Sequence, residues 1–131
     1  MNKTVYKEDL LYPEQSYKLV GLAYIVYNEL GAGHLEKVYQ KAYAMELKEA
    51  KLNFKEQVPH KVIYKEEVIG NNYFDFLIDG KIIVELKRSN FYSKKYFDQV
   101  ANYLKISNLK LALIINFTGE GVRVKRIVNM I

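Results

Sequence analysis

The sequence predicts a mixed α/β fold (α+β), in which helices flank a mixed β-sheet. Three observations favour it. Apolar residues recur at helical spacing near the N-terminus and again after residue 94. Apolar and polar residues alternate along residues 73–87, as in half-buried strands. Residues 111–115 form a continuous apolar run, which is typical of a strand covered on both faces. This mixture of elements predicts a sheet with helices packed on it.

Length and composition are those of one compact domain. The chain has 131 residues, half of them hydrophobic, so we expect a single domain over residues 1–131, with residues 1–12 as an extended lead-in. The absence of cysteine excludes disulfides, thiolate nucleophiles and cysteine-ligated metal centres. No signal-peptide core or membrane-spanning run is present, which predicts a cytoplasmic protein without a membrane partner. The net charge of +5 permits nucleic-acid binding without requiring it.

Three helices are expected. The first covers residues 13–30, because Pro13 suits the first position of a helix and apolar residues follow at helical spacing. Gly31-Ala32-Gly33 ends it, since glycine tolerates the left-handed backbone of a C-terminal cap. A second helix is predicted over residues 34–51 and a third over residues 95–107.

The first two strands should follow the second helix. Residues 54–64 alternate loosely, and Pro59 indicates an edge strand or a bulge. Residues 65–67 turn the chain into a strand that starts at Val68. Gly70-Asn71-Asn72 is expected to be an irregular point in that strand.

The last two strands are residues 111–115 and an antiparallel return over residues 122–128, joined by a turn at residues 118–121. The return strand carries the densest basic cluster of the chain. Its members are Arg123, Lys125 and Arg126. A solvated edge strand is the first interpretation of this cluster, and phosphate contact is the second.

Residues 73–87 read as a hairpin with three charged residues among apolar ones. Six apolar residues occupy even positions: Phe74, Phe76, Ile78, Ile82, Val84 and Leu86. Asp75, Glu85 and Lys87 occupy odd positions, and Asp79-Gly80 marks the turn.

The length of the turn decides which side chains share a face. A two-residue loop would pair Asp75 with Val84 and send Glu85 to the other face. A three-residue loop over residues 78–80 pairs Asp75 with Ile83 and places all six apolar residues on one face. Burial is worth about 1.5–3 kcal/mol per large apolar side chain, which favours the three-residue loop. The three charged side chains then share the opposite face.

Two carboxylates and a lysine on one face can hold a hard divalent cation and place an amine beside it. The alternative is a buried ion pair between Lys87 and Glu85 or Asp75. Desolvation tends to cancel the Coulomb gain of such pairs, so three buried charges are hard to explain by stability alone. A functional site is therefore the preferred interpretation.

Asp75 and the sequence Glu85-Leu86-Lys87 resemble the signature of the PD-(D/E)XK nuclease superfamily, with Phe74 in place of its proline. The sequence from Gly33 to Tyr39 also resembles the GxxExxY motif of one small branch of that superfamily. The resemblance covers nearly all of the chain from Glu14 onward. It includes the segments Tyr27–Gly33, Gln57-Val58-Pro59, Asn102-Tyr103-Leu104 and Ile115-Asn116-Phe117.

The resemblance implies a restriction-endonuclease-like core and a metal-dependent nuclease, with DNA favoured over RNA as substrate. It implies that Asp75, Glu85 and the Leu86 carbonyl bind Mg²⁺ or Mn²⁺. Glu36 would complete the metal site, although an acid in the first turn of a helix is also explained by the macrodipole. Lys87 would position or activate the attacking water.

Gln99 and Tyr103 resemble the QxxxY element of RecB-like members and would border the metal site. Tyr39 lies three residues after Glu36 and could orient it, and it is also assigned to the rim of the site or to the substrate. The alternative function is a catalytically inactive module that binds nucleic acid or a partner and retains the nuclease fold.

Overall fold

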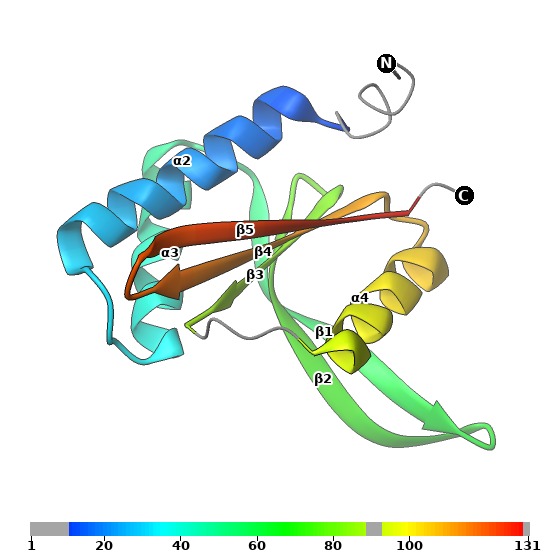
Figure 1. The fold of residues 1–131 in the computed structure, drawn as a ribbon. Helices are drawn as coiled ribbons and strands as arrows, with labels where there is room; N and C mark the ends of the chain where they lie inside the picture. Colours follow the sequence, from blue (N-terminus) through cyan, green and yellow to red (C-terminus); the bar gives the residue numbers. More distant parts are fainter. Residues whose placement is uncertain (1–10, 89–92, 130–131) are drawn as a thin grey trace, which may run out of the picture.

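The computed structural model describes residues 11–88 and 93–129 (Figure 1). The five strands form one sheet in the order β1-β2-β3-β4-β5. Strands β3 and β4 are parallel and the other neighbours are antiparallel, so the sheet is mixed, as expected. In chain order the elements are α2 (Pro13–Leu30), α3 (Glu36–Glu49), β1 (Phe54–Tyr64), β2 (Glu67–Ile78), β3 (Ile82–Lys87), α4 (Lys94–Ser107), β4 (Leu111–Thr118) and β5 (Gly121–Val128). Most of the predicted lead-in, residues 1–10, lies outside the described residues.

Helices cover both faces of the sheet (Figure 1). Helices α2 and α3 pack on one face and α4 packs on the other, which divides the core into two clusters. On the α2/α3 face the sheet contributes Phe76, Ile78, Ile82, Val84, Leu86, Leu111, Leu113, Ile115 and Phe117. On the α4 face it contributes Phe74, Ile83 and Ala112. Strand β4 is buried along its whole length, as its apolar run predicts.

Helix α2 has the predicted bounds, with Pro13 in its first turn and Gly31 beyond its end at φ 71°. Helix α3 begins at Glu36, two residues later than expected, because Leu35 still has an extended backbone. The His34 ring lies 3.0 Å from the Leu30 carbonyl oxygen, so this residue closes the turn between the helices.

Tyr39 joins this turn to the core. Its side chain is fully buried, and its ring stacks on Phe117 with centroids 4.2 Å apart. Its hydroxyl donates to the Gly31 carbonyl oxygen at 2.6 Å and accepts from the His34 N–H at 3.3 Å. Tyr39 therefore sets where α3 begins, and with it the position of Glu36.

We expect Tyr39→Phe to lower the free energy of unfolding by about 1–3 kcal/mol, because the Gly31 carbonyl loses its buried donor while the stacked ring remains. Urea unfolding measures this change. Tyr17→Phe, at an exposed position of α2, is the matched control and should change stability by less than about 0.5 kcal/mol. An equal loss in both variants would contradict the proposed role of the Tyr39 hydroxyl.

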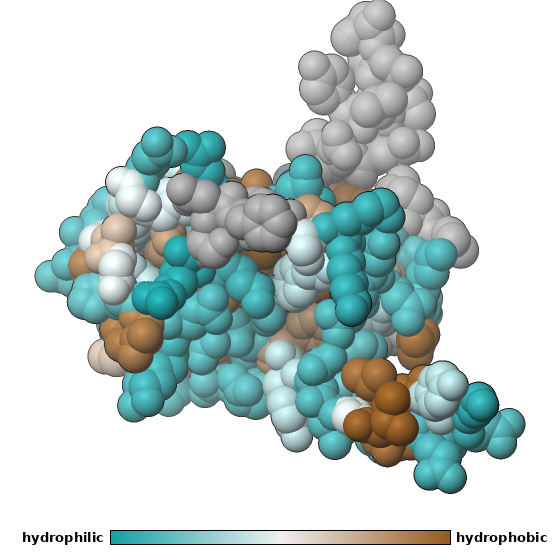
Figure 2. Space-filling model, turned by 60° about the horizontal axis from the view of Figure 1, so that its bottom comes forward, coloured by the Kyte–Doolittle hydropathy of each residue, from teal (hydrophilic) through white to brown (hydrophobic). Residues whose placement is uncertain are grey.

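Strands β1 and β2 form an arm that extends beyond the sheet (Figure 1). They pair from Phe54 to Tyr64, whereas β2 pairs with β3 only between residues 76 and 78. Pro59 lies in β1, an edge strand, as predicted. The irregular point is not at residues 70–72, which are paired with β1; the register shifts at Ile69, one residue earlier. Figure 2 shows an exposed apolar patch on the arm. It includes Ile63, Tyr64, Val68 and Ile69.

The turn between β2 and β3 combines an Asp-Gly turn with a three-residue loop. Asp79 and Gly80 adopt positive φ angles of 55° and 67°, and the Lys81 N–H donates to the Ile78 carbonyl oxygen at 2.9 Å. Lys81 is the third loop residue, so Ile78 pairs with Ile82. The predicted loop length is correct but its position is wrong. The extra residue follows the Asp-Gly turn, and this register places Asp75 opposite Glu85 instead of Ile83.

Candidate active site

The candidate site lies where β2 and β3 separate. Their last paired residues are Phe76 and Val84, and beyond them side chains replace the backbone ladder. The Leu86 N–H donates to Asp75 Oδ2 at 2.7 Å, and the Asp75 N–H donates to Glu85 Oε1 at 2.8 Å. Each carboxylate thus binds the backbone of the opposite strand. This exchange fixes both side chains in a buried position, with Asp75 6% and Glu85 7% exposed.

Asp75 marks a change of face along β2, and here the prediction of a single apolar face is wrong. Phe76 packs on the α2/α3 side as expected, but Phe74 packs on the α4 side against Tyr103, at a centroid distance of 4.7 Å. Strand twist at the end of the ladder separates these two even positions. Asp75 consequently reaches α3, where Gln40 Nε2 donates to its Oδ1 at 2.8 Å. Glu85 borders α4, so the carboxylates meet in the gap between the strands and not on one open face.

The two carboxyl groups are costly to ionise. Burial raises the pKa of Asp75 to about 6, and the nearby charge of Glu36 adds to the effect. Burial, and then the charge of Asp75, raises the pKa of Glu85 to about 7. The Leu86 N–H and the Lys87 ammonium act in the opposite direction on Asp75. Closely spaced carboxylates with these properties suit a hard divalent cation, which would stabilise both in their charged form.

Lys87 lies beside the pair, as the sequence predicts. Its Nζ is 3.8 Å from Glu85 Oε2 and 4.5 Å from the centre of the Tyr96 ring. The Tyr96 hydroxyl is buried near Glu85, and burial followed by the charge of Glu85 raises its pKa. In the sequence, Tyr96 recurs at helical spacing with Val100 and Leu104, a pattern that indicates a core residue and does not reveal its position beside Glu85 and Lys87.

Glu36 approaches the pair without joining it. It is the first residue of α3, one turn before Gln40, and its charge acts on Asp75. Within residues 11–88 and 93–129, however, no three carboxylate or histidine side chains gather closely enough to hold a metal ion. The structure therefore does not assemble the third carboxylate ligand that the resemblance implied. Gln40, which sequence reasoning missed, makes the helix contact with Asp75 instead.

A small cleft of about 220 Å³ opens next to the pair, between the base of the arm and α4. Gln99 lines it together with Glu85 and Lys87, as expected for a rim residue. The other lining residues are Asn72, Tyr73, Phe74 and Tyr96. A larger hollow of about 480 Å³ lies near Asp79, but its two carboxylates are exposed and it is distant from the buried pair.

The other two predicted rim residues do not line this cleft. Tyr103 packs against Phe74 and His60, with the His60 ring centre 5.1 Å away. Tyr39 is fully buried and its hydroxyl is bonded to Gly31, so the predicted rim position is wrong for this residue. Its effect on Glu36 is indirect, through the start of α3.

A mixed five-stranded sheet with helices on both faces defines an α/β fold of three layers. A family model of the PD-(D/E)XK nuclease superfamily matches residues 13–127, so the chain belongs to this superfamily. The match spans all eight described helices and strands apart from the last residue of β5. Membership of the GxxExxY branch stays a prediction.

Two solved structures are similar to this chain at low sequence identity, and the first of them supports the fold. The crystal structure of SSO0001 matches with a TM-score of 0.54 and 15% identity, over 72% of this chain and 50% of that protein. The present chain thus corresponds to half of that protein. An alkaline exonuclease (LHK-Exo) from Laribacter hongkongensis matches with a TM-score of 0.48 and 14% identity, over 88% of this chain and 69% of that one. No curated protein matches the sequence.

The helices in the described part of the chain are too short or too polar to cross a membrane.

Proposed function

We propose that this protein is a divalent-metal-dependent nuclease that hydrolyses phosphodiester bonds, with DNA favoured as its substrate. One observation carries the proposal. Asp75 and Glu85 are buried together, at the cost of raised pKa values, with Lys87 beside them. Buried acid pairs with perturbed pKa values are characteristic of functional sites. Superfamily membership supplies the reaction class. The cytoplasmic location and the single-domain organisation of residues 1–131 also stay predictions.

Asp75 and Glu85 are the residues that would hold Mg²⁺ or Mn²⁺. The Leu86 carbonyl is a suitable third donor, because N–H and C=O of one strand residue point to the same side and the Leu86 N–H points to Asp75. Glu36 would contribute after a change of rotamer or through water. When bound, the cation supplies Lewis-acid stabilisation of the scissile phosphate and makes water a stronger nucleophile.

Lys87 and the cleft residues would act on the substrate itself. Contacts with Glu85 and Tyr96 hold the Lys87 amine beside the acid pair, where it can donate to a phosphate oxygen or orient the attacking water. Gln99 offers an amide among the residues that line the cleft. These positions support the proposed roles of Lys87 in transition-state stabilisation and of Gln99 in substrate orientation.

The direct test is cleavage of labelled single-stranded, double-stranded and branched DNA, and of RNA, with Mg²⁺, Mn²⁺ or EDTA. We expect cleavage only in the presence of a metal ion, with DNA cleaved faster than RNA. Faster cleavage of RNA would reverse the substrate assignment.

The lack of a three-ligand cluster in the described part of the chain favours one alternative, a binding module that retains the fold without catalysis. In that case no substrate would be cleaved under any condition, and Lys87→Met would bind nucleic acid as the unmodified protein does. The presence of all three residues of the acid-and-lysine signature argues against this alternative.

A further inference from the structure

We propose that β4 and β5 carry a phosphate track, formed by Asn116, Arg123 and Lys125, which binds the nucleic-acid backbone next to the acid pair. This inference rests on the proposed function, because it names the surface by which the substrate reaches the same site. None of the three residues belongs to the acid-and-lysine signature or to the cleft.

The sheet register places the track in line with the site. Lys87 pairs with Asn116, and Asn116 pairs with Arg123. One row further along the sheet, Glu85 is connected through Ile114 to Lys125. Paired residues point to the same face, and adjacent strands lie about 4.8 Å apart. Two rows of paired residues therefore run from β3 across β4 to β5, a distance of about 10 Å, and each row ends in a basic side chain.

The fold divides the basic cluster that the sequence shows in β5. Arg126 faces α2, where it donates to Ser16 Oγ and to the Leu11 carbonyl oxygen, each at 3.1 Å. Arg123 and Lys125 are exposed on the opposite face, which carries Glu85 and Lys87. This arrangement favours phosphate contact for two members of the cluster and a structural role for the third.

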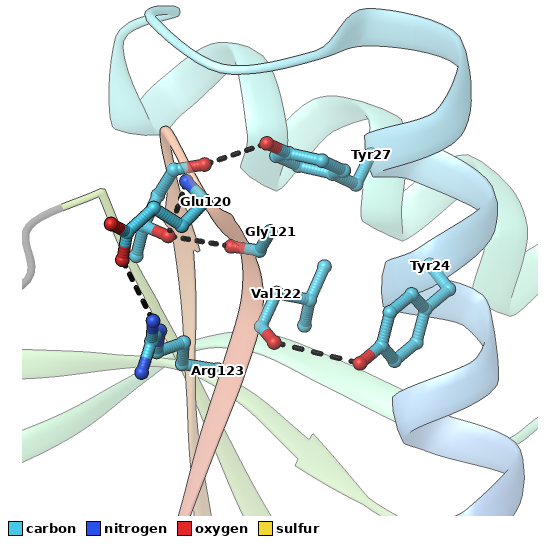
Figure 3. Close-up of polar contacts among 7 residues, drawn as sticks. Tyr24, Tyr27, Glu120, Gly121, Val122 and Arg123 are labelled. Atoms are coloured by element: carbon cyan, nitrogen blue, oxygen red, sulfur yellow. Dashed lines mark hydrogen bonds and ion pairs between the residues drawn. The ribbon is translucent and has the colours of Figure 1, made fainter.

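The β4–β5 turn holds Arg123 in this orientation (Figure 3). Tyr24 and Tyr27 of α2 donate to carbonyl oxygens of Val122 and Thr118, whereas Arg123 points away from α2. Arg123 Nη2 lies 2.8 Å from Glu120 Oε1 in a pair that is exposed at both ends. Exposed pairs of this kind are weak, so a phosphate can replace the Glu120 carboxylate.

Asn116 provides independent evidence of a ligand. It is fully buried between Lys87 and Arg123, yet within residues 11–88 and 93–129 neither its Nδ2 nor its Oδ1 has a hydrogen-bond partner. Buried amides are almost always paired, because an unpaired one destabilises the fold. A phosphate oxygen can accept from Nδ2 once the surrounding side chains part, and the low local dielectric strengthens such a bond.

Binding measured against salt concentration tests the track. The double variant Arg123→Gln/Lys125→Gln should bind a labelled DNA duplex about 10–100-fold more weakly at about 0.1 M salt. The slope of log K against log salt should become less steep by about 1.8, since each phosphate contact on a duplex contributes about 0.9. Lys48→Gln/Lys110→Gln removes the same charge from exposed positions outside the track and should leave the slope unchanged. Equal effects of the two double variants would overturn the proposal.

Asn116→Leu separates a binding role from a structural one. The two side chains have the same branched shape, so removal of the unpaired amide should maintain or raise the Tm of the free protein while weakening DNA binding about 5–10-fold. A lower Tm with unchanged DNA binding would overturn the role of Asn116. If this variant does not fold, Asn116→Val, which also removes the amide, provides the same comparison.

Cleavage assays on the same variants distinguish this inference from the proposed function. If the unmodified protein cleaves nothing but Arg123→Gln/Lys125→Gln still lowers the salt slope, the track is supported and the nuclease proposal fails. If cleavage is present and the slope is unchanged, the track is overturned and the nuclease proposal stands. Absence of any nucleic-acid binding would overturn both.

Discussion

Lys87→Met should reduce metal-dependent cleavage by about 10²–10⁴-fold, the range expected when a positioned proton donor or acceptor is lost. The methionine retains most of the apolar stem, so its contact with the Tyr96 ring should persist and the fold should survive. Glu85 loses the cation that lies 3.8 Å from its Oε2, and its pKa should therefore rise further. Metal binding should then need a somewhat higher pH.

Three measurements check this expectation: the single-turnover cleavage rate, the Tm without metal and the increase in Tm on addition of Mn²⁺. At about pH 8 the increase in Tm should persist in Lys87→Met while the cleavage rate falls. Lys48→Met, at an exposed position of α3, is the matched control for the loss of one lysine. Cleavage by Lys87→Met at the unmodified rate would remove Lys87 from the reaction.

The elements of this fold could be predicted from the sequence because local signals and burial agree. Pro13 and Gly31 bound the first helix, and the apolar run of β4 reflects a strand covered by helices on both sides. Pro59 indicated an edge strand, and β1 is one. Each of these features depends on residues that are close in sequence, and in each case the tertiary contacts agree with the local preference.

The register at the site could not be predicted in the same way. Alternation along β2 and β3 correctly indicates that odd-numbered residues pair with odd-numbered residues. This rule still holds when the pairing shifts by two residues, from Ile83 to Glu85 opposite Asp75, so alternation alone does not determine the register. Alternation also assumes a continuous ladder. At Asp75 the ladder ends, and Phe74 moves to the opposite face from Phe76.

Two residues of the site, Gln40 and Tyr96, could not be predicted because they reach it through contacts between elements that are distant in sequence. Gln40 reaches Asp75 across 35 positions of sequence, and its only local signal is that it lies four residues after Glu36 on the same helix. Tyr96 looks like a core residue of α4 because it recurs at helical spacing with Val100 and Leu104. Its relation to Glu85 appears only when α4 is placed on the sheet.

Asp75→Asn should abolish both metal-dependent cleavage and the increase in Tm caused by Mn²⁺, because it removes one of only two carboxylates in the pair. The asparagine can keep the hydrogen bond from the Leu86 N–H through its oxygen, and Gln40 can turn its own oxygen to the new amide. The hydrogen bonds that link β2 and β3 at the site should therefore persist. Loss of metal binding without loss of fold distinguishes this variant from Lys87→Met.

The metal-free protein should also become more stable in this variant, in a manner that depends on pH. The folded pKa of Asp75, about 6, exceeds the usual value of 3.8, so the native state binds more protons than the unfolded state at intermediate pH. Stability therefore falls as pH rises from about 4 to about 7. An asparagine at this position carries no charge, so the variant avoids this loss of stability, which is at most about 3 kcal/mol when the pKa rises from 3.8 to about 6.

Urea unfolding in EDTA measures this difference. Asp75→Asn and the unmodified protein should have similar stability at about pH 4, and the variant should be more stable by about 1–3 kcal/mol at about pH 8. Mn²⁺ should reduce this difference, because it stabilises only the protein that retains both carboxylates. Glu49→Gln, at an exposed position of α3, is the matched control for the loss of one carboxylate. If the variant were equally destabilised at both pH values, the Asp75 hydrogen bonds would outweigh the repulsion between the carboxylates. The pair would then be a structural feature and not a strained site that a cation relieves.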